Sequence, residues 1–185
     1  MTAKGAETRQ RMIAAAQDSL ERNGYFGTGL NPVLAASGTP KGSLYFHFPG
    51  GKDELVVAAI EDARGLIDTM VDAIGDKAPA EVVAALIGLL GERLETSGWQ
   101  CGCPVATVAL EVAGTNDAVQ QACSNTYTVW TSALRTRLEA AGRADAERLA
   151  VSALALIEGA LLLARAHRSR EPLVQAARTI ADLLG

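Results

Sequence analysis

The chain has 185 residues, of which 49% are apolar and 21% charged, a composition typical of globular proteins rather than disordered or fibrous ones. Only 4% of the side chains are aromatic. The net charge of −4 excludes a protein that coats nucleic acid along its whole length, but the charge is unevenly distributed. Residues 1–52 carry six Lys/Arg against three Asp/Glu, and residues 53–185 carry eleven against eighteen. A small basic segment ahead of an acidic remainder favours a nucleic-acid partner for the first segment.

The N-terminal sequence MTAKGAETRQRM contains no apolar stretch of the kind that secretory signals have. The longest apolar run, residues 149–164, is interrupted by Ser152, Glu158 and Gly159. It falls short of the roughly 20 apolar residues that a membrane span needs. We therefore expect a cytoplasmic protein with no membrane partner.

The three cysteines, Cys101, Cys103 and Cys123, are an odd number without a secretory signal, which indicates reduced thiols. A single residue separates the first two, and the only histidines are His47 and His167, so no metal site is expected. No nucleophile elbow or dinucleotide-binding pattern occurs, so we expect neither a cofactor nor an enzyme.

Glycines and prolines divide the chain into helical lengths. Residues 6–23 are predicted to form the first helix, with Ile13, Ala16 and Leu20 on one face and a stop at Gly24. Alanine and leucine, which dominate the composition, are strong helix formers.

A short second helix over residues 28–37 is predicted to end at Gly38. Thr39-Pro40 then opens a third helix that runs to His47, because a hydroxyl cap followed by proline suits a helix start. Helix, short helix, glycine turn and short helix form a helix-turn-helix pattern.

Six further helices are predicted, and no sustained alternation of apolar residues indicates a strand. Their ranges are 52–75, 79–96, 104–113, 116–141, 144–168 and 172–184. The predicted fold is all-α, with an N-terminal three-helix helix-turn-helix domain over residues 1–51 and a larger helical domain over residues 52–185.

Five of the eight aromatic side chains fall within the helix-turn-helix region: Tyr25, Phe26, Tyr45, Phe46 and Phe48. A domain of about 50 residues needs bulky side chains to build a core. We therefore expect most of these rings, Tyr45 excepted, to have a structural role in the core rather than to contact bases.

Residues 24–55, GYFGTGLNPVLAASGTPKGSLYFHFPGGKDEL, resemble the DNA-binding signature of TetR-type transcriptional repressors. The matching positions are Gly24, Tyr25, Thr28, Ala35, Gly38, Lys41, Gly42, Leu44, Tyr45, His47, Phe48 and Lys52. The larger domain resembles one subgroup, the lincomycin-resistance and flavonoid-responsive repressors, in residues 102–105 and 157–160. The resemblance implies a DNA-binding first domain and a ligand-binding, dimer-forming second domain.

In a helix-turn-helix the last helix enters the major groove with its N-terminal residues at the base edges. Lys41 is then the best base reader, since an ammonium can donate to guanine O6 and N7. The residues predicted to contact DNA are Thr28, Thr39, Pro40, Lys41, Ser43, Tyr45, His47 and Lys52. The resemblance assigns the phosphate backbone to Tyr45, His47 and Lys52, and the start of the second helix favours the same for Thr28.

Two of these positions have a second explanation. His47 can instead be a helix-end residue that binds backbone carbonyls. Gly42 indicates a close approach either to DNA or to the first helix, and the sequence does not decide between them.

The predicted helix over residues 144–168 is apolar on nearly all sides and must be covered all round. Pairing it and the last helix across a two-fold axis would cover both, which is also the TetR-type arrangement, and would imply a palindromic operator. The predicted interface residues are Leu154, Ile157, Leu161, Leu173, Ala177, Ile180 and Leu184. The alternative is a monomer that covers both helices itself.

The resemblance also implies a small-molecule cavity in the larger domain. The predicted lining is Leu66, Met70, Trp99, Cys103, Val108, Tyr127, Trp130, Glu158 and Leu162, any of which can instead be an ordinary core residue. Glu158 needs a partner because it lies in an apolar run. That partner can be a cationic or hydroxylated ligand, or an arginine or polar group across the dimer.

Taken together, these features predict a repressor that is released from operator DNA when a small, mostly apolar molecule shifts the population of its conformations. Repression itself follows from the resemblance alone. The alternatives are a redox regulator that uses Cys101, Cys103 or Cys123, a small helical enzyme, and a helical adaptor that binds only protein.

Overall fold

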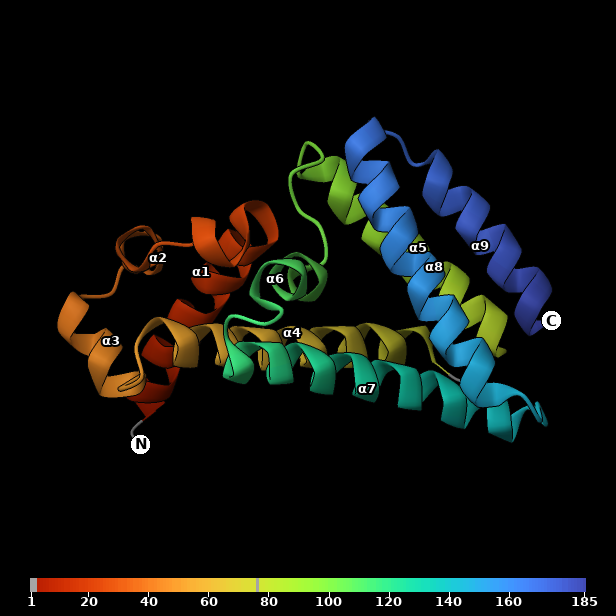
Figure 1. Cartoon of the computed structure of the whole chain (residues 1–185), viewed down its shortest axis with the longest axis horizontal. Coiled ribbons are helices and arrows are strands. Elements are labelled where there is room, and N and C mark those ends of the chain that lie inside the picture. The colour runs from red at the N-terminus through yellow and green to blue at the C-terminus, as the bar shows by residue number, and fades with distance from the viewer. Residues whose placement is uncertain (1–2, 76) are drawn as a thin grey trace. The chain divides into compact units, whose positions relative to one another are not determined.

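The computed structural model describes residues 3–75 and 77–185, in which it has nine helices and no strand (Figure 1). The helices are α1 (Ala3–Gly27), α2 (Leu30–Ser37), α3 (Lys41–His47), α4 (Lys52–Ile74), α5 (Pro79–Thr96), α6 (Pro104–Val112), α7 (Asp117–Ala140), α8 (Ala146–His167) and α9 (Glu171–Leu184). The predicted all-α fold is confirmed.

The chain forms two compact units, which we call the head unit and the body unit. The head unit consists of Met1–Gly65 and Pro104–Thr126, and the body unit of Leu66–Cys103 and Tyr127–Gly185. Helix α6 and the first part of α7 therefore pack with the N-terminal helices, although about forty residues separate them in sequence. The compact units do not test whether one domain ends and another begins after residue 51, so that predicted boundary stays a prediction.

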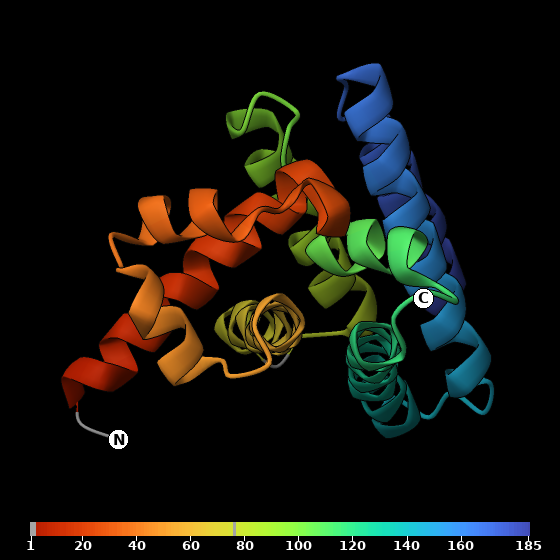
Figure 2. The same ribbon diagram turned by 60° about the vertical axis from the view of Figure 1, so that its left-hand side comes forward.

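The core of the head unit is built from the apolar faces of its helices, and α2 packs against α1 at an angle (Figure 2). The buried side chains include Met12, Ile13, Ala16, Leu20, Val33, Leu34, Leu44, Phe48, Leu55, Val56, Ala59, Ile60, Val105, Val108, Val112 and Val119. Helix α1 continues past its predicted end because a helical turn resumes after a kink at Gly24 (φ 68°, ψ −171°).

The turn of the helix-turn-helix motif closes as predicted at Gly38, which is left-handed (φ 63°) and donates its N–H to the Ala35 carbonyl. The start of the third helix differs from the prediction by one residue. Pro40 is the extended N-cap of α3, while the Thr39 hydroxyl turns inward to the Ser37 hydroxyl (2.6 Å). The predicted capping role of Thr39 is therefore wrong.

Helices α5, α8 and α9 pack against one another in the body unit. Helix α9 buries Leu173, Ala176, Ile180 and Leu184, whose spacing of three and four residues places them on one face. By length and composition α8 could cross a membrane, but its inner face lies in this core, as expected for the central helix of a helical domain.

Candidate functional site

Helix α3 presents a mixed polar and aromatic face to solvent. Lys41, Gly42, Tyr45 and Phe46 are exposed, while Leu44 is fully buried. Ser43 and His47 are half-buried, and Pro40 is exposed at the N-cap. The candidate DNA-binding surface is this outer face of α3.

The expectation that Phe26 and Phe46 are core residues is wrong, since their side chains are 66% and 78% exposed. A helix of seven residues has one inner face, and Leu44 and Phe48 occupy it. Phe46 lies two residues from each of them, about 200° around the helix. Sequence reasoning missed Phe46 as a surface residue, although the spacing from Leu44 could have identified it.

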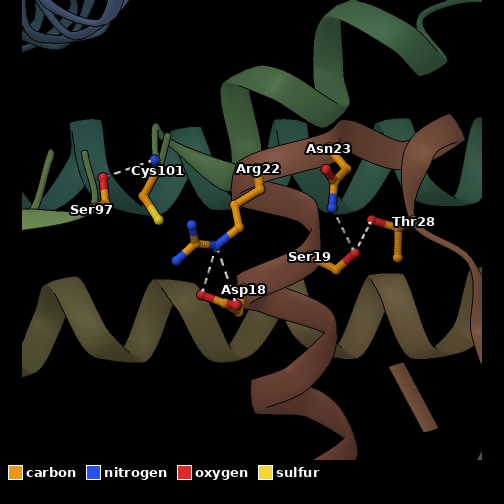
Figure 3. A network of polar contacts seen from close by, with 7 residues as sticks. All are labelled: Asp18, Ser19, Arg22, Asn23, Thr28, Ser97 and Cys101. Atoms are coloured by element: carbon orange, nitrogen blue, oxygen red, sulfur yellow. Dashed lines mark hydrogen bonds and ion pairs between the residues drawn. The ribbon is translucent and has the colours of Figure 1, made fainter. Parts of the chain in front are cut away.

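Two predicted DNA contacts, Thr28 and Thr39, are only 2% and 8% exposed. The Thr28 hydroxyl donates to the Gly24 carbonyl (2.7 Å) and contacts the Ser19 hydroxyl (3.0 Å), as Figure 3 shows for the latter pair. The Thr39 hydroxyl faces Ser37. Both hydroxyls brace turns of the head unit, and their positions do not support the predicted roles at phosphates or bases.

Lys52 begins α4, and its ammonium lies 4.3 Å from the centre of the Tyr25 ring. The turn before it is held by Glu54, whose carboxylate accepts the Gly50 N–H (2.7 Å). The Tyr25 ring thus positions the ammonium group of Lys52, the residue predicted to contact a DNA phosphate.

Gly42 has open space around it, because a Cβ added there would meet no atom within 4 Å. A close approach to α1 is therefore excluded as the reason for this glycine. The close approach of DNA to α3 stays a prediction for this glycine.

Replacing Gly42 with alanine is expected to stabilise α3 by about 0.5–1 kcal/mol, because alanine is the better helix former. The same methyl group is expected to weaken DNA binding by intruding on the major-groove surface. Thermal unfolding and operator titration measure the two effects separately. Gly88→Ala is the matched control, since a Cβ on this α5 glycine also meets nothing. Unchanged operator affinity in the Gly42 variant would contradict the explanation.

In the body unit, the Cys103 thiol donates a hydrogen bond to the Glu158 carboxyl group of α8. Burial raises the pKa of Glu158, and the hydrogen bond from Cys103 offsets this only in part. The Glu158 Oε2 atom is buried without a hydrogen-bond partner in the described part of the chain, as is the Trp130 Nε1 atom. The Trp130 ring meets Tyr127 edge-on at 5.8 Å. A buried acceptor and a buried donor are therefore left unsatisfied.

The other predicted ligand contacts are dispersed. Trp99 has a left-handed backbone (φ 65°) and packs against the body core. Val108 is fully buried in the core of the head unit, and Leu162 is 62% exposed. The side chains of Leu66 and Met70, on α4, lie outside the described residues. The structure brings together Cys103 with Glu158 and Tyr127 with Trp130.

Replacing Glu158 with glutamine is expected to stabilise the chain at neutral pH, because an amide removes the cost of a buried charge. The pKa of this carboxyl is above 4.5 in the folded chain, so the folded state retains a proton that the unfolded state releases. The contribution of Glu158 to stability therefore falls as pH rises from about 4.5 through the folded pKa. The difference in unfolding free energy between variant and wild type should grow over that range, and a constant difference would contradict the assignment.

Two of the three cysteines, Cys101 and Cys123, are poorly placed for a thiol-based sensor. Burial raises the pKa of Cys123 to about 11, so this residue is a thiol and not a thiolate at neutral pH. Cys101 is buried, and its N–H donates to the Ser97 hydroxyl (3.1 Å; Figure 3). Among the described residues, no group of three or more His, Cys, Asp or Glu side chains could hold a metal ion.

The predicted dimer residues lie mostly inside the chain's own core. Five of the seven are buried among α5, α8 and α9: Ile157, Leu161, Leu173, Ile180 and Leu184. Leu154 and Ala177 are half-buried. The reasoning that one subunit cannot cover these side chains is wrong, because α5 packs against both helices. The opposite face of α8 is the one left exposed, with Val151 and Leu162.

Comparison with known proteins places both parts of the chain in one family. Residues 12–59 match the model of bacterial regulatory proteins of the tetR family, and residues 79–179 match that of the LmrA/YxaF-like C-terminal domain of transcriptional regulators. The chain is a TetR-family transcriptional regulator. This family consists of DNA-binding regulators and not of enzymes.

Full-length relatives support the assignment to the TetR family. The HTH-type transcriptional regulator LmrA of Bacillus subtilis is 32% identical over 96% of this chain and 97% of its own. The uncharacterized regulator YxaF of the same organism is 28% identical over 100% and 98%. A TetR regulator of Chloroflexus aurantiacus has a crystal structure that matches with a TM-score of 0.83 and 29% identity, over 98% of this chain and 96% of that one.

Proposed function

We propose that this TetR-family regulator is a repressor that reads its operator with the outer face of α3 and is released by a small molecule. The observation that carries the proposal is the exposure of Lys41, Tyr45 and Phe46 on one helix of a helix-turn-helix motif. Lysine can read guanine, and aromatic rings can contact the thymine methyl group or the backbone. Ser43 and His47 flank this face and would add hydrogen bonds to DNA.

The unsatisfied polar atoms of Glu158 and Trp130 support a ligand with both a donor and an acceptor on a mostly apolar frame. A ligand of this kind would release DNA only if it binds more tightly to the conformation that does not bind the operator. The difference between its two affinities sets how much DNA is released. A compound that binds tightly but leaves operator affinity unchanged would be an occupant and not an inducer.

A homodimer is the form in which we propose the regulator binds DNA. Val151, Leu162 and Leu163 of α8 are each at least half exposed, and Val174 of α9 is also exposed. An apolar helix face of this kind favours a second copy of the chain, which would present two heads to a palindromic operator. The compartment would be the cytoplasm, where the DNA is.

The test is binding of the full-length chain to the DNA upstream of its own gene, followed by fluorescence anisotropy. We expect specific binding that weakens steeply between about 50 and 200 mM salt, because Lys and Arg displace counterions from phosphates. A shuffled fragment of equal length is the control. Sedimentation at micromolar concentration is expected to show a dimer. Absence of salt-sensitive, sequence-dependent binding would reject the proposed function.

A further inference from the structure

The C-terminal end of α1 is held by residues from α6 and from the start of α7. The Phe26 N–H donates to the Glu111 Oε2 atom (3.0 Å). Both residues belong to the head unit, although 85 positions separate them in the chain. Glu111 lies within residues 79–179, the part that matches the C-terminal domain model.

Gly24 makes this contact possible. A Cβ at this position would lie 2.3 Å from the Glu111 Oε1 atom, so the carboxylate would have to leave its present place, and the positive φ of 68° also favours glycine here. The kink at Gly24 also starts a new helical turn, and the N–H groups that open a helical turn need acceptors from outside it. A carboxylate is the group best suited to accept such an N–H, because helix N-termini are partially positive.

Asn116 makes a second contact through both ends of its amide. Its oxygen accepts the Val119 N–H (3.1 Å) and so caps α7. Its nitrogen donates to the Tyr25 hydroxyl (3.3 Å), which in turn donates to Asp53 (2.5 Å) in the first turn of α4. Partial burial raises the pKa of Tyr25, and the hydrogen bond to Asp53 raises it further by a smaller amount. The phenol therefore keeps the proton that it donates.

The contacts of Asn116 and Asp53 with Tyr25 lead to Lys52, a residue predicted to bind DNA. The Tyr25 ring that Asn116 and Asp53 hold is the ring beneath the Lys52 ammonium. A shift of α7 relative to α1 would therefore move the ring that supports Lys52, and a shift of α6 would move the end of α1.

We infer that Glu111 and Asn116 are positioning residues for DNA recognition, which couple α6 and α7 to the end of α1 and the start of α4. The inference rests on the proposed DNA-binding function and assigns part of its regulation to two named side chains. Neither residue need touch DNA. Their effect on operator affinity passes through Phe26 on one path and through Tyr25 and Lys52 on the other.

The first experiment separates positioning from stability at Asn116. Asn116→Ser keeps an oxygen that caps α7 but removes the amide donor, and Tyr25→Phe keeps the ring beneath Lys52 but removes the hydroxyl. Each variant is expected to bind the operator fragment about 3- to 10-fold more weakly, because Asn116→Ser removes the hydrogen bond to Tyr25 and Tyr25→Phe removes that bond and the one to Asp53. The double variant should bind no more weakly than Tyr25→Phe alone, because that substitution already removes the contact with Asn116. Thermal unfolding is measured alongside, and affinities are compared well below the unfolding temperature.

The second experiment uses Glu111. Glu111→Ala removes the acceptor and is expected to weaken operator binding, whereas Glu111→Gln retains an acceptor oxygen and should recover most of the affinity. A purely structural role would lower the unfolding temperature of the alanine variant and leave the operator affinity of the folded protein unchanged. If the wild type binds the operator, and Asn116→Ser, Tyr25→Phe, their double variant and Glu111→Ala all bind it with the same affinity, the inference alone is overturned. Absence of operator binding by the wild type would overturn the proposed function together with it.

Discussion

Replacing Phe48 with alanine is expected to lower the free energy of unfolding by about 3–5 kcal/mol, the usual cost of removing a buried aromatic ring. The Phe48 ring is fully buried behind α3, and the Arg9 guanidinium lies 5.0 Å from its centre. The variant loses both the apolar contacts and this cation–π contact. Operator binding is expected to disappear with the fold of the head unit. Chemical denaturation followed by circular dichroism, with an anisotropy titration, measures the two effects.

Phe46→Ala is the matched control for that experiment. It removes the same kind of ring two residues earlier in the chain, but from a position that is largely exposed. Its unfolding free energy should stay within about 0.5 kcal/mol of the wild type, as for most surface substitutions. Any loss of operator affinity in this variant would then report a contact with DNA. Equal destabilisation by both substitutions would contradict the assignment of Phe48 to the core and of Phe46 to the surface.

Replacing Lys41 with alanine is expected to weaken operator binding by about 1–3 kcal/mol and to relax the preference for one base pair. The reason is the place of Lys41 in the first turn of α3, with an exposed side chain. Titrations against operators changed at single base pairs measure the preference, and the unfolding free energy should not change. Lys77→Ala is the control, because it removes the same charge from an exposed position outside the helices.

The pattern of losses across the operator variants decides the role of Lys41. A loss confined to one base pair supports base reading, whereas a uniform loss with a smaller salt slope would make Lys41 a phosphate contact. Unchanged affinity and specificity would remove Lys41 from the interface altogether.

The helices could be predicted closely because their limits are local signals. Gly24, Gly38, Pro79 and Pro104 each stand within a residue or two of an observed break, start or end. The predicted start of α3 is wrong by one residue because the Thr39 hydroxyl has two possible partners, the first N–H groups of α3 and the Ser37 hydroxyl. Only the folded turn determines which of them it meets. A hydroxyl pattern by itself does not distinguish the two.

The candidate site was predicted in part, and its errors have a common cause. Periodicity shows that a helix has an apolar side but not which neighbour covers it, so Phe46 was placed inside the core and Leu161 at a dimer interface. The contacts of Glu111 and Asn116 could not be predicted from local patterns at all. These contacts join segments that lie more than eighty residues apart in sequence. Neither segment contains a local signal that identifies the other as its partner.

The pairing of Gly24 with Glu111 has a consequence for engineering. Consider a chimera that joins the first 51 residues of another regulator to the remainder of this one. The end of its α1 would then meet the Glu111 carboxylate, whose position here requires glycine at residue 24. A relative with any larger residue at that place would displace the Glu111 carboxylate and lose its hydrogen bond to the Phe26 N–H. Transplants of binding specificity into this scaffold should therefore exchange residues 104–126 along with the recognition helices, or exchange only the outward-facing side chains of α3.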